Sequence, residues 1–99
     1  MTLLLYDIVI TILFGRWSHL HELGVLRHVL KTVGGIAEKN RIEAVKFITL
    51  EVGIQSTYVP AYLTKLYSVA ADPYPALRNA ELKINMVSGK GLTIKEIEY

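Results

Sequence analysis

The feature that most constrains the fold of this 99-residue chain is the complete absence of cysteine. Without cysteine, the chain forms no disulfides, binds no zinc through thiolates and has no cysteine nucleophile. A domain of this size must then fold around a single hydrophobic core. Hydrophobic residues make up 52% of the chain and charged residues 20%, a composition that excludes intrinsic disorder and indicates a compact domain.

The distribution of charge and hydropathy excludes two classes of partner. The net charge is +2 and the eleven Lys and Arg residues are scattered, so no basic surface for nucleic acid is predicted. The apolar run from Leu3 to Phe14 contains Asp7 and is shorter than the roughly 20 residues of a membrane span. It also lacks the basic start and the cleavage site of a secretion signal. We therefore expect a cytoplasmic protein.

The segment from Leu20 to Lys39 shows the hydrophobic spacing of an amphipathic helix. Gly34 and Gly35 weaken this helix by about 1 kcal/mol each relative to alanine, and Asn40 is a suitable stop. The apolar positions are Leu23, Leu26, Leu30, Val33 and Ala37, flanked by Val29 and Ile36. The opposite face, predicted to be solvated, carries Glu22, Arg27, Lys31, Glu38 and Lys39.

The rest of the chain reads as a strand, a helix and two more strands. A strand is predicted over Val45 to Val52, and Gly53 ends it. A second helix begins at Pro60, whose fixed φ suits the first helical position. It directs Tyr62, Leu63, Leu66, Tyr67 and Ala70 inward, and Asp72-Pro73-Tyr74-Pro75 blocks its continuation.

Alternating apolar residues predict a second strand around Leu82 to Met86, and Ser88 to Gly91 forms a tight connection to a third strand over Leu92 to Tyr99. The element order is helix, strand, helix, strand, strand. The predicted fold is an α+β two-layer sandwich in which two helices pack on a small mixed three-stranded sheet.

Three sequence elements in order resemble the HypA family, the nickel-delivery proteins of hydrogenase maturation. They are His21-Glu22-Leu23 at the head of the first helix, Leu50-Glu51-Val52-Gly53 at the end of a strand, and Ser56 four residues before Pro60. The resemblance runs from residue 20 to residue 99. It implies a binding protein rather than an enzyme, and the sequence has no recognisable pair of nucleophile and base.

The chain departs from this family at the zinc module, which has two Cys-x-x-Cys pairs in family members. Here the strand that ends near Met86 leads directly to Ser88-Gly89-Lys90-Gly91. The resemblance therefore implies that the module is excised, leaving two adjacent strands joined by a short turn. Such a module is a self-contained unit stabilised by its own metal, so the core can survive its loss. We expect no structural zinc.

The resemblance also implies a weak nickel site at His21 and Glu22, with His19 as an additional candidate ligand. In the family, a terminal amine, backbone nitrogen and the adjacent imidazole form the chelate rings that square-planar Ni(II) favours. Here Leu20 stands where the initiator methionine would be. Leucine codons include UUG and CUG, which serve as bacterial starts. We therefore divide the chain into an N-terminal extension, 1–19, whose translation is open to question, and a HypA-like domain, 20–99.

The same residues also have simpler interpretations. A His-Glu pair at a helix start can merely solvate it, with Glu22 complementing the helix dipole. His28 lies two turns, roughly 10 Å, further along the helix and is expected at the surface. Glu51 is expected to be a solvated carboxylate at a strand end. The four tyrosines Tyr58, Tyr62, Tyr67 and Tyr74 are expected to pack around the second helix rather than form an interaction face.

By resemblance, the protein hands nickel to a maturation GTPase or to a hydrogenase large subunit, and homodimer formation is left open. The alternative is a divergent adaptor that keeps the HypA fold and its partner surface but binds no metal. A third reading is an unrelated two-layer α+β domain in which the His-Glu pair is accidental.

Overall fold

The computed structural model describes the backbone of residues 1–10 and 19–99 and the side chains of residues 1–5 and 22–99. The described residues form two helices, one short 3-10 turn and four strands. In chain order the elements are β1 (Thr2–Ile10), α1 (His19–Lys39), β2 (Phe47–Gly53), α2 (Pro60–Ala71), η1 (Pro75–Leu77), β3 (Glu81–Val87) and β4 (Leu92–Glu98).

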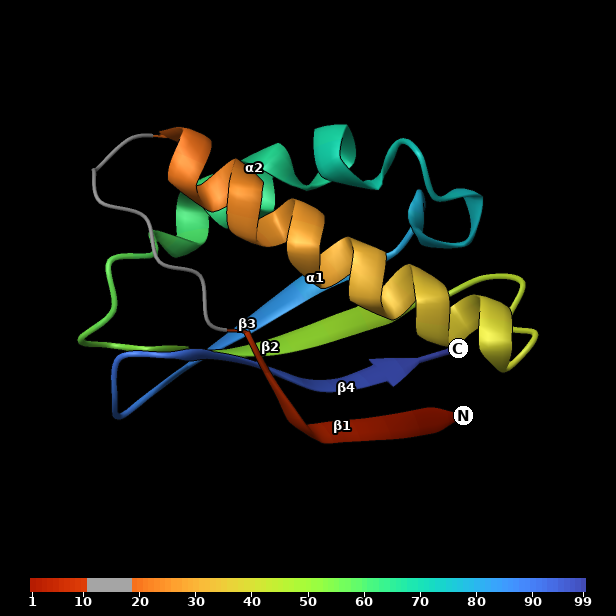
Figure 1. The fold of residues 1–99 in the computed structure, drawn as a ribbon, viewed down its shortest axis with the longest axis horizontal. Coiled ribbons are helices and arrows are strands. Elements are labelled where there is room, and N and C mark those ends of the chain that lie inside the picture. Colours follow the sequence, from red (N-terminus) through yellow and green to blue (C-terminus); the bar gives the residue numbers. More distant parts are fainter. Residues whose placement is uncertain (11–18) are drawn as a thin grey trace.

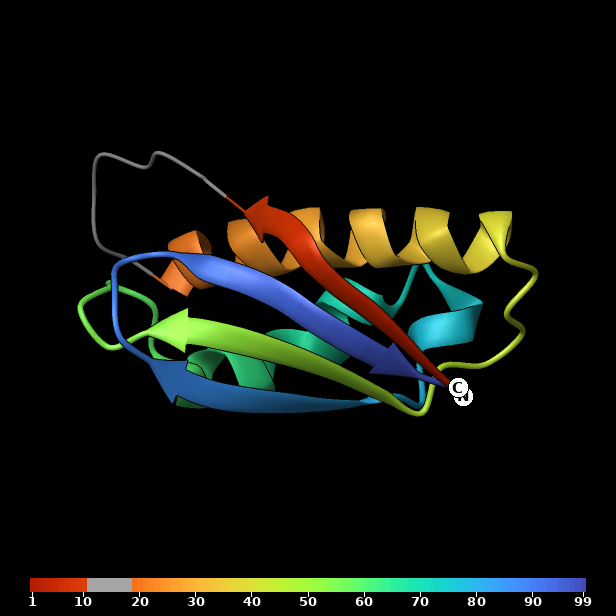
Figure 2. The same cartoon turned by 90° about the horizontal axis from the view of Figure 1, so that it is seen from below.

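The strands form one sheet in the order β1-β4-β2-β3. β4 runs antiparallel to both β1 and β2, whereas β3 runs parallel to β2. Both helices cover the same face of this sheet, as Figures 1 and 2 show from two directions. The predicted two-layer α+β architecture with a mixed sheet is therefore confirmed.

The prediction of three strands was wrong, because Thr2–Ile10 forms a fourth strand. This strand pairs with β4 in the register Thr2↔Glu98, Leu3↔Ile97 and Leu4↔Glu96, and Leu5 joins the core. The Tyr99 N–H donates to the Met1 carbonyl at 2.8 Å. β1 thus covers an edge of β4 that would otherwise present unpaired backbone groups.

The expectation that the last two strands are neighbours was also wrong, because β2 lies between β3 and β4. The link between them crosses the end of β2. The N–H groups of Gly53, Ile54 and Gln55 donate to the carbonyls of Gly91, Val87 and Gly89, at 2.8, 2.8 and 2.9 Å. A short turn is compatible with this crossing because β3 is parallel to β2 and β4 is antiparallel to it.

The core lies between the helices and the sheet. α1 contributes Val25, Leu26, Val29, Leu30, Val33 and Ala37, which are all buried, and β2 contributes Ile48, Leu50 and Val52. The buried residues of α2 are Leu63, Tyr67, Ala70 and Ala71, while Tyr62 and Leu66 are half-buried. On the edge strand β3, Met86 stays 47% exposed.

α1 ends at Lys39, next to the predicted stop at Asn40. The residue whose backbone conformation ends the helix is Arg41, one position later. Arg41 has a φ of 55°, in the left-handed region. The Ile42 N–H donates to the Ala37 carbonyl at 2.8 Å and the Arg41 N–H to the Glu38 carbonyl at 3.2 Å. These two bonds satisfy the last helical carbonyls in the Schellman pattern and direct the chain towards β2.

Candidate metal centre at the start of α1

Glu22, in the first turn of α1, connects the two helices. Its side chain is only 4% exposed, and its Oε1 accepts a hydrogen bond from the Val59 N–H at 3.4 Å. Val59 is the N-cap of α2 and has no side-chain cap of its own. Because the first N–H groups of a helix lack helical partners, the Glu22 carboxylate supplies an acceptor that α2 needs.

The predicted position of Glu22 on the solvated face of α1 was therefore wrong. The hydrophobic spacing predicted a helix with one buried side and one solvated side, and it placed Glu22 on the solvated side. In the structure α1 also packs against α2, so the buried face of α1 extends to Glu22. The other charged residues expected on the solvated face, Arg27, Lys31, Glu38 and Lys39, are exposed.

Tyr58, in the loop before α2, has a polar side chain near Glu22. It is half-buried, and burial raises the pKa of its hydroxyl, with the nearby negative charge of Glu22 raising this pKa further. The Tyr58 N–H donates to the Ser56 Oγ at 3.4 Å. The Ser56 to Val59 loop thus brings a hydroxyl close to the Glu22 carboxylate. Tyr58 was predicted to be a packing residue, because no local motif links it to Glu22 across 36 positions.

Of the predicted nickel ligands, only Glu22 has a described side chain. The backbones of His19 and His21 lie in the first turn of α1, but their side chains lie outside the described residues. Among described side chains, no group of three or more His, Cys, Asp or Glu residues could hold a metal ion. His28 is exposed, as predicted, and Glu51 is half-buried near the end of β2. No helix within the described ranges is long and apolar enough to cross a membrane.

Two helices on one face of a mixed four-stranded sheet, with His21-Glu22 in the first turn of the leading helix, define a small two-layer α+β protein. Residues 20–93 match the family model described as "Hydrogenase/urease nickel incorporation, metallochaperone, hypA". The chain therefore belongs to the HypA family, and the predicted resemblance is confirmed. No curated protein matches this sequence.

A solved structure shares the fold. The solution structure of the Ni metallochaperone HypA from Helicobacter pylori superimposes with a TM-score of 0.62 and 15% sequence identity. The match covers 67% of this chain and 56% of that one, so this chain spans little more than half of its structural relative. The likeness is one of fold. The family match begins at Leu20, so β1 lies outside it.

Proposed function

We propose that this protein is a nickel-binding metallochaperone that serves hydrogenase maturation, with nickel as its cargo. The observation that carries the proposal is the family match, which starts at Leu20 and so includes His21 and Glu22. The proposed partners are a maturation GTPase or a hydrogenase large subunit, met in the cytoplasm. The chain has no cysteine, so we expect no tightly bound zinc. Stoichiometric zinc that survives dialysis would contradict this expectation.

His21 is proposed as the imidazole ligand, and His19 as an additional one. Glu22 is buried in the first turn of α1, where one carboxylate oxygen accepts the Val59 N–H. We assign the nickel contact to its other oxygen. The Val59 bond then fixes the first turn of α1 against α2 and orients the site. This arrangement ties nickel binding to the contact between the two helices.

The proposed ligand set is tested on the full chain and on a shorter version that starts with Met in place of Leu20. Only the shorter version presents an α-amine beside the His21 imidazole, so we expect it to bind Ni(II) more tightly in titration calorimetry. The reference pKa values are about 8 for the amine and about 6.5 for imidazole. Because both must lose protons before coordinating nickel, affinity should fall as pH drops towards about 6.

The controls separate the ligands from the fold. His21→Ala in the shorter version should abolish the gain, whereas His28→Ala, on the exposed face of α1, should leave it unchanged. Circular dichroism must first show that the shorter version folds, because it lacks β1. Equal nickel affinity in the full chain, the shorter version and its His21→Ala variant would remove His21 and the new terminus from the site.

A second candidate function, the metal-free adaptor, is favoured by the burial of Glu22 and its bond to Val59. These contacts give Glu22 a structural role that needs no nickel. Glu22→Gln distinguishes the two, because the amide oxygen can still accept the Val59 N–H but no longer carries a charge. A chaperone should lose nickel affinity in this variant. An adaptor should show no nickel binding before or after the change.

A further inference from the structure

An open hollow of about 250 Å³ lies beside the C-terminal half of α1. Its lining residues come from α1, from the segment after it, from the loop after α2 and from η1, and only Glu38 among them is charged. They are Gly34, Ala37, Glu38, Ile42, Pro73, Tyr74, Pro75 and Ala76. Glu38 is 16 residues from Glu22, roughly 24 Å along the helix, so the hollow is separate from the proposed nickel site.

The aromatic wall of the hollow is held in place before any ligand arrives. The Tyr74 N–H donates to the Ala71 carbonyl at 2.9 Å, and the Tyr74 carbonyl accepts from the Leu77 N–H at 2.9 Å. Its ring packs on Gly34, where an added Cβ would lie 2.8 Å from Tyr74 Cδ1. Pro73 and Pro75, on either side of Tyr74, restrict the φ angles of the loop.

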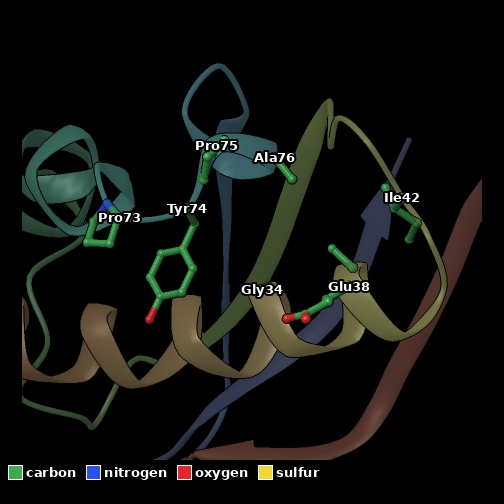
Figure 3. A pocket seen from close by; sticks show the side chains of 8 residues that line it. Gly34, Glu38, Ile42, Pro73, Tyr74, Pro75 and Ala76 are labelled. Atoms are coloured by element: carbon green, nitrogen blue, oxygen red, sulfur yellow. The ribbon is translucent and has the colours of Figure 1, made fainter.

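The Glu38 carboxylate makes no direct bond, neither a hydrogen bond nor an ion pair, to another described residue. Of the cations close to the hollow in sequence, Lys39 and Arg41 are exposed, and Arg78 donates its Nε–H to the Asp72 carbonyl at 2.8 Å. Figure 3 shows Glu38 extending along α1 towards the side on which Tyr74 reaches down from the loop. A negative group, an aromatic ring and apolar walls therefore surround one space.

We propose that this hollow binds an arginine side chain of a partner protein. A guanidinium is planar, stacks on aromatic rings and pairs with a carboxylate through two parallel hydrogen bonds. It is also more weakly hydrated than an ammonium, which lowers the cost of entering a partly apolar site. The methylene stem of arginine would cover the walls formed by Ala37, Ile42 and Pro75. The guanidinium would thus contact Glu38 and Tyr74, and the methylene stem would contact the apolar walls.

The test is an NMR titration of the full-length, isotopically labelled protein with N-acetyl-arginine N-methylamide, which mimics an arginine within a peptide. We expect saturable shifts of the Gly34, Glu38 and Tyr74 amides. The matched citrulline derivative keeps the shape but not the charge, and should bind about tenfold more weakly, because its hydrogen bonds to the carboxylate no longer join two opposite charges. Guanidinium ion alone lacks the stem and should also bind more weakly.

The variant Glu38→Gln should weaken binding of the arginine derivative about tenfold. Glu43→Gln, an exposed carboxylate outside the hollow, should not change it. Neither substitution removes buried apolar surface, so both variants should fold. Equal affinity for the arginine and citrulline derivatives, equal affinity for guanidinium ion, shifts confined to other surfaces, or the absence of saturable shifts would each overturn the proposal.

Discussion

The backbone of Gly89 lies directly against Gly53, so that a Cβ added at Gly53 would overlap the Gly89 carbonyl oxygen and lie 2.8 Å from the Lys90 nitrogen. This contact occurs where the link between β3 and β4 crosses the end of β2. The obstructing atoms are backbone and cannot rotate away as a side chain could. A residue with no side chain is therefore required at position 53, because β3 and β4 lie on opposite sides of β2.

Gly53→Ala should lower the free energy of unfolding by at least about 2 kcal/mol, because the crossing backbone must shift to admit a methyl group. Gly91→Ala is the matched control in the same link, since an added Cβ there meets nothing within 4 Å. It should change stability by no more than about 0.5 kcal/mol. Urea unfolding followed by circular dichroism measures both. Equal effects of the two substitutions would show that the link does not press on β2.

Two adjacent glycines in α1 should respond in opposite directions to alanine. Gly35→Ala should stabilise the protein by about 0.5 to 1 kcal/mol, because the added Cβ meets nothing within 4 Å and alanine is the better helix former. Gly34→Ala gains the same propensity but drives its Cβ into the Tyr74 ring, and should give a net loss of about 1 kcal/mol or more. Thermal unfolding of the two variants compares them. A gain at both positions would mean that Tyr74 moves without cost.

A leucine-to-alanine substitution should destabilise the protein more at Leu26 in α1 than at Leu66 in α2. Leu26 is fully buried and Leu66 only half-buried. Leu26→Ala should therefore cost about 3 to 5 kcal/mol and Leu66→Ala about 1 to 2 kcal/mol. Helical spacing alone predicted that both residues face the core equally. Urea midpoints give the comparison, and a larger effect at Leu66 would contradict the described packing of α2.

The Tyr67 hydroxyl should make stability fall in alkaline solution. It donates to the Leu77 carbonyl at 2.7 Å, and burial raises its pKa from 10.0 to about 12. Above pH 10 the unfolded chain loses this proton while the folded chain keeps it, so fewer protons are bound in the unfolded state and stability declines with pH. The contribution is complete below pH 10 and lost near pH 12.

Tyr67→Phe tests this assignment. It should cost about 1 kcal/mol at neutral pH, because the Leu77 carbonyl loses its 2.7 Å bond and keeps only the Ala80 N–H at 3.2 Å, and it should reduce the slope of stability between pH 10 and 12. Urea unfolding at several pH values gives both quantities. An unchanged slope in the variant would show that another group governs the alkaline transition, for example Tyr58, whose pKa is also raised.

The sequence pattern predicted the elements with local signatures. α1 and α2 carry helical spacing with clear stop signals, and β2, β3 and β4 alternate or end at glycine. β1 was missed because the apolar run that contains it, which Asp7 interrupts, was considered only as a membrane span or a secretion signal. Its partner, β4, lies about ninety positions away, and no local pattern encodes that pairing. The order of β2 between β3 and β4 was missed for the same reason.

In the candidate site too, short sequence motifs were predictive, whereas contacts between residues far apart in the sequence were not predicted. The family resemblance was identified from three short elements in order, of which His21-Glu22-Leu23 is the first, and the family is confirmed over residues 20–93. The burial of Glu22 was not predicted, because it depends on the approach of Val59 from another helix. The nickel ligands themselves remain a prediction.

The pairing of β1 with β4 also sets an order of events in folding. These strands are separated by nearly the whole chain, so bringing them together carries a larger loop-closure cost than joining β2 to its neighbours. β1 should therefore add last to a sheet already formed by β2, β3 and β4. As an edge strand held on one side only, it should also be the first to detach, exchanging its amide hydrogens with solvent faster than β2 at the centre of the sheet.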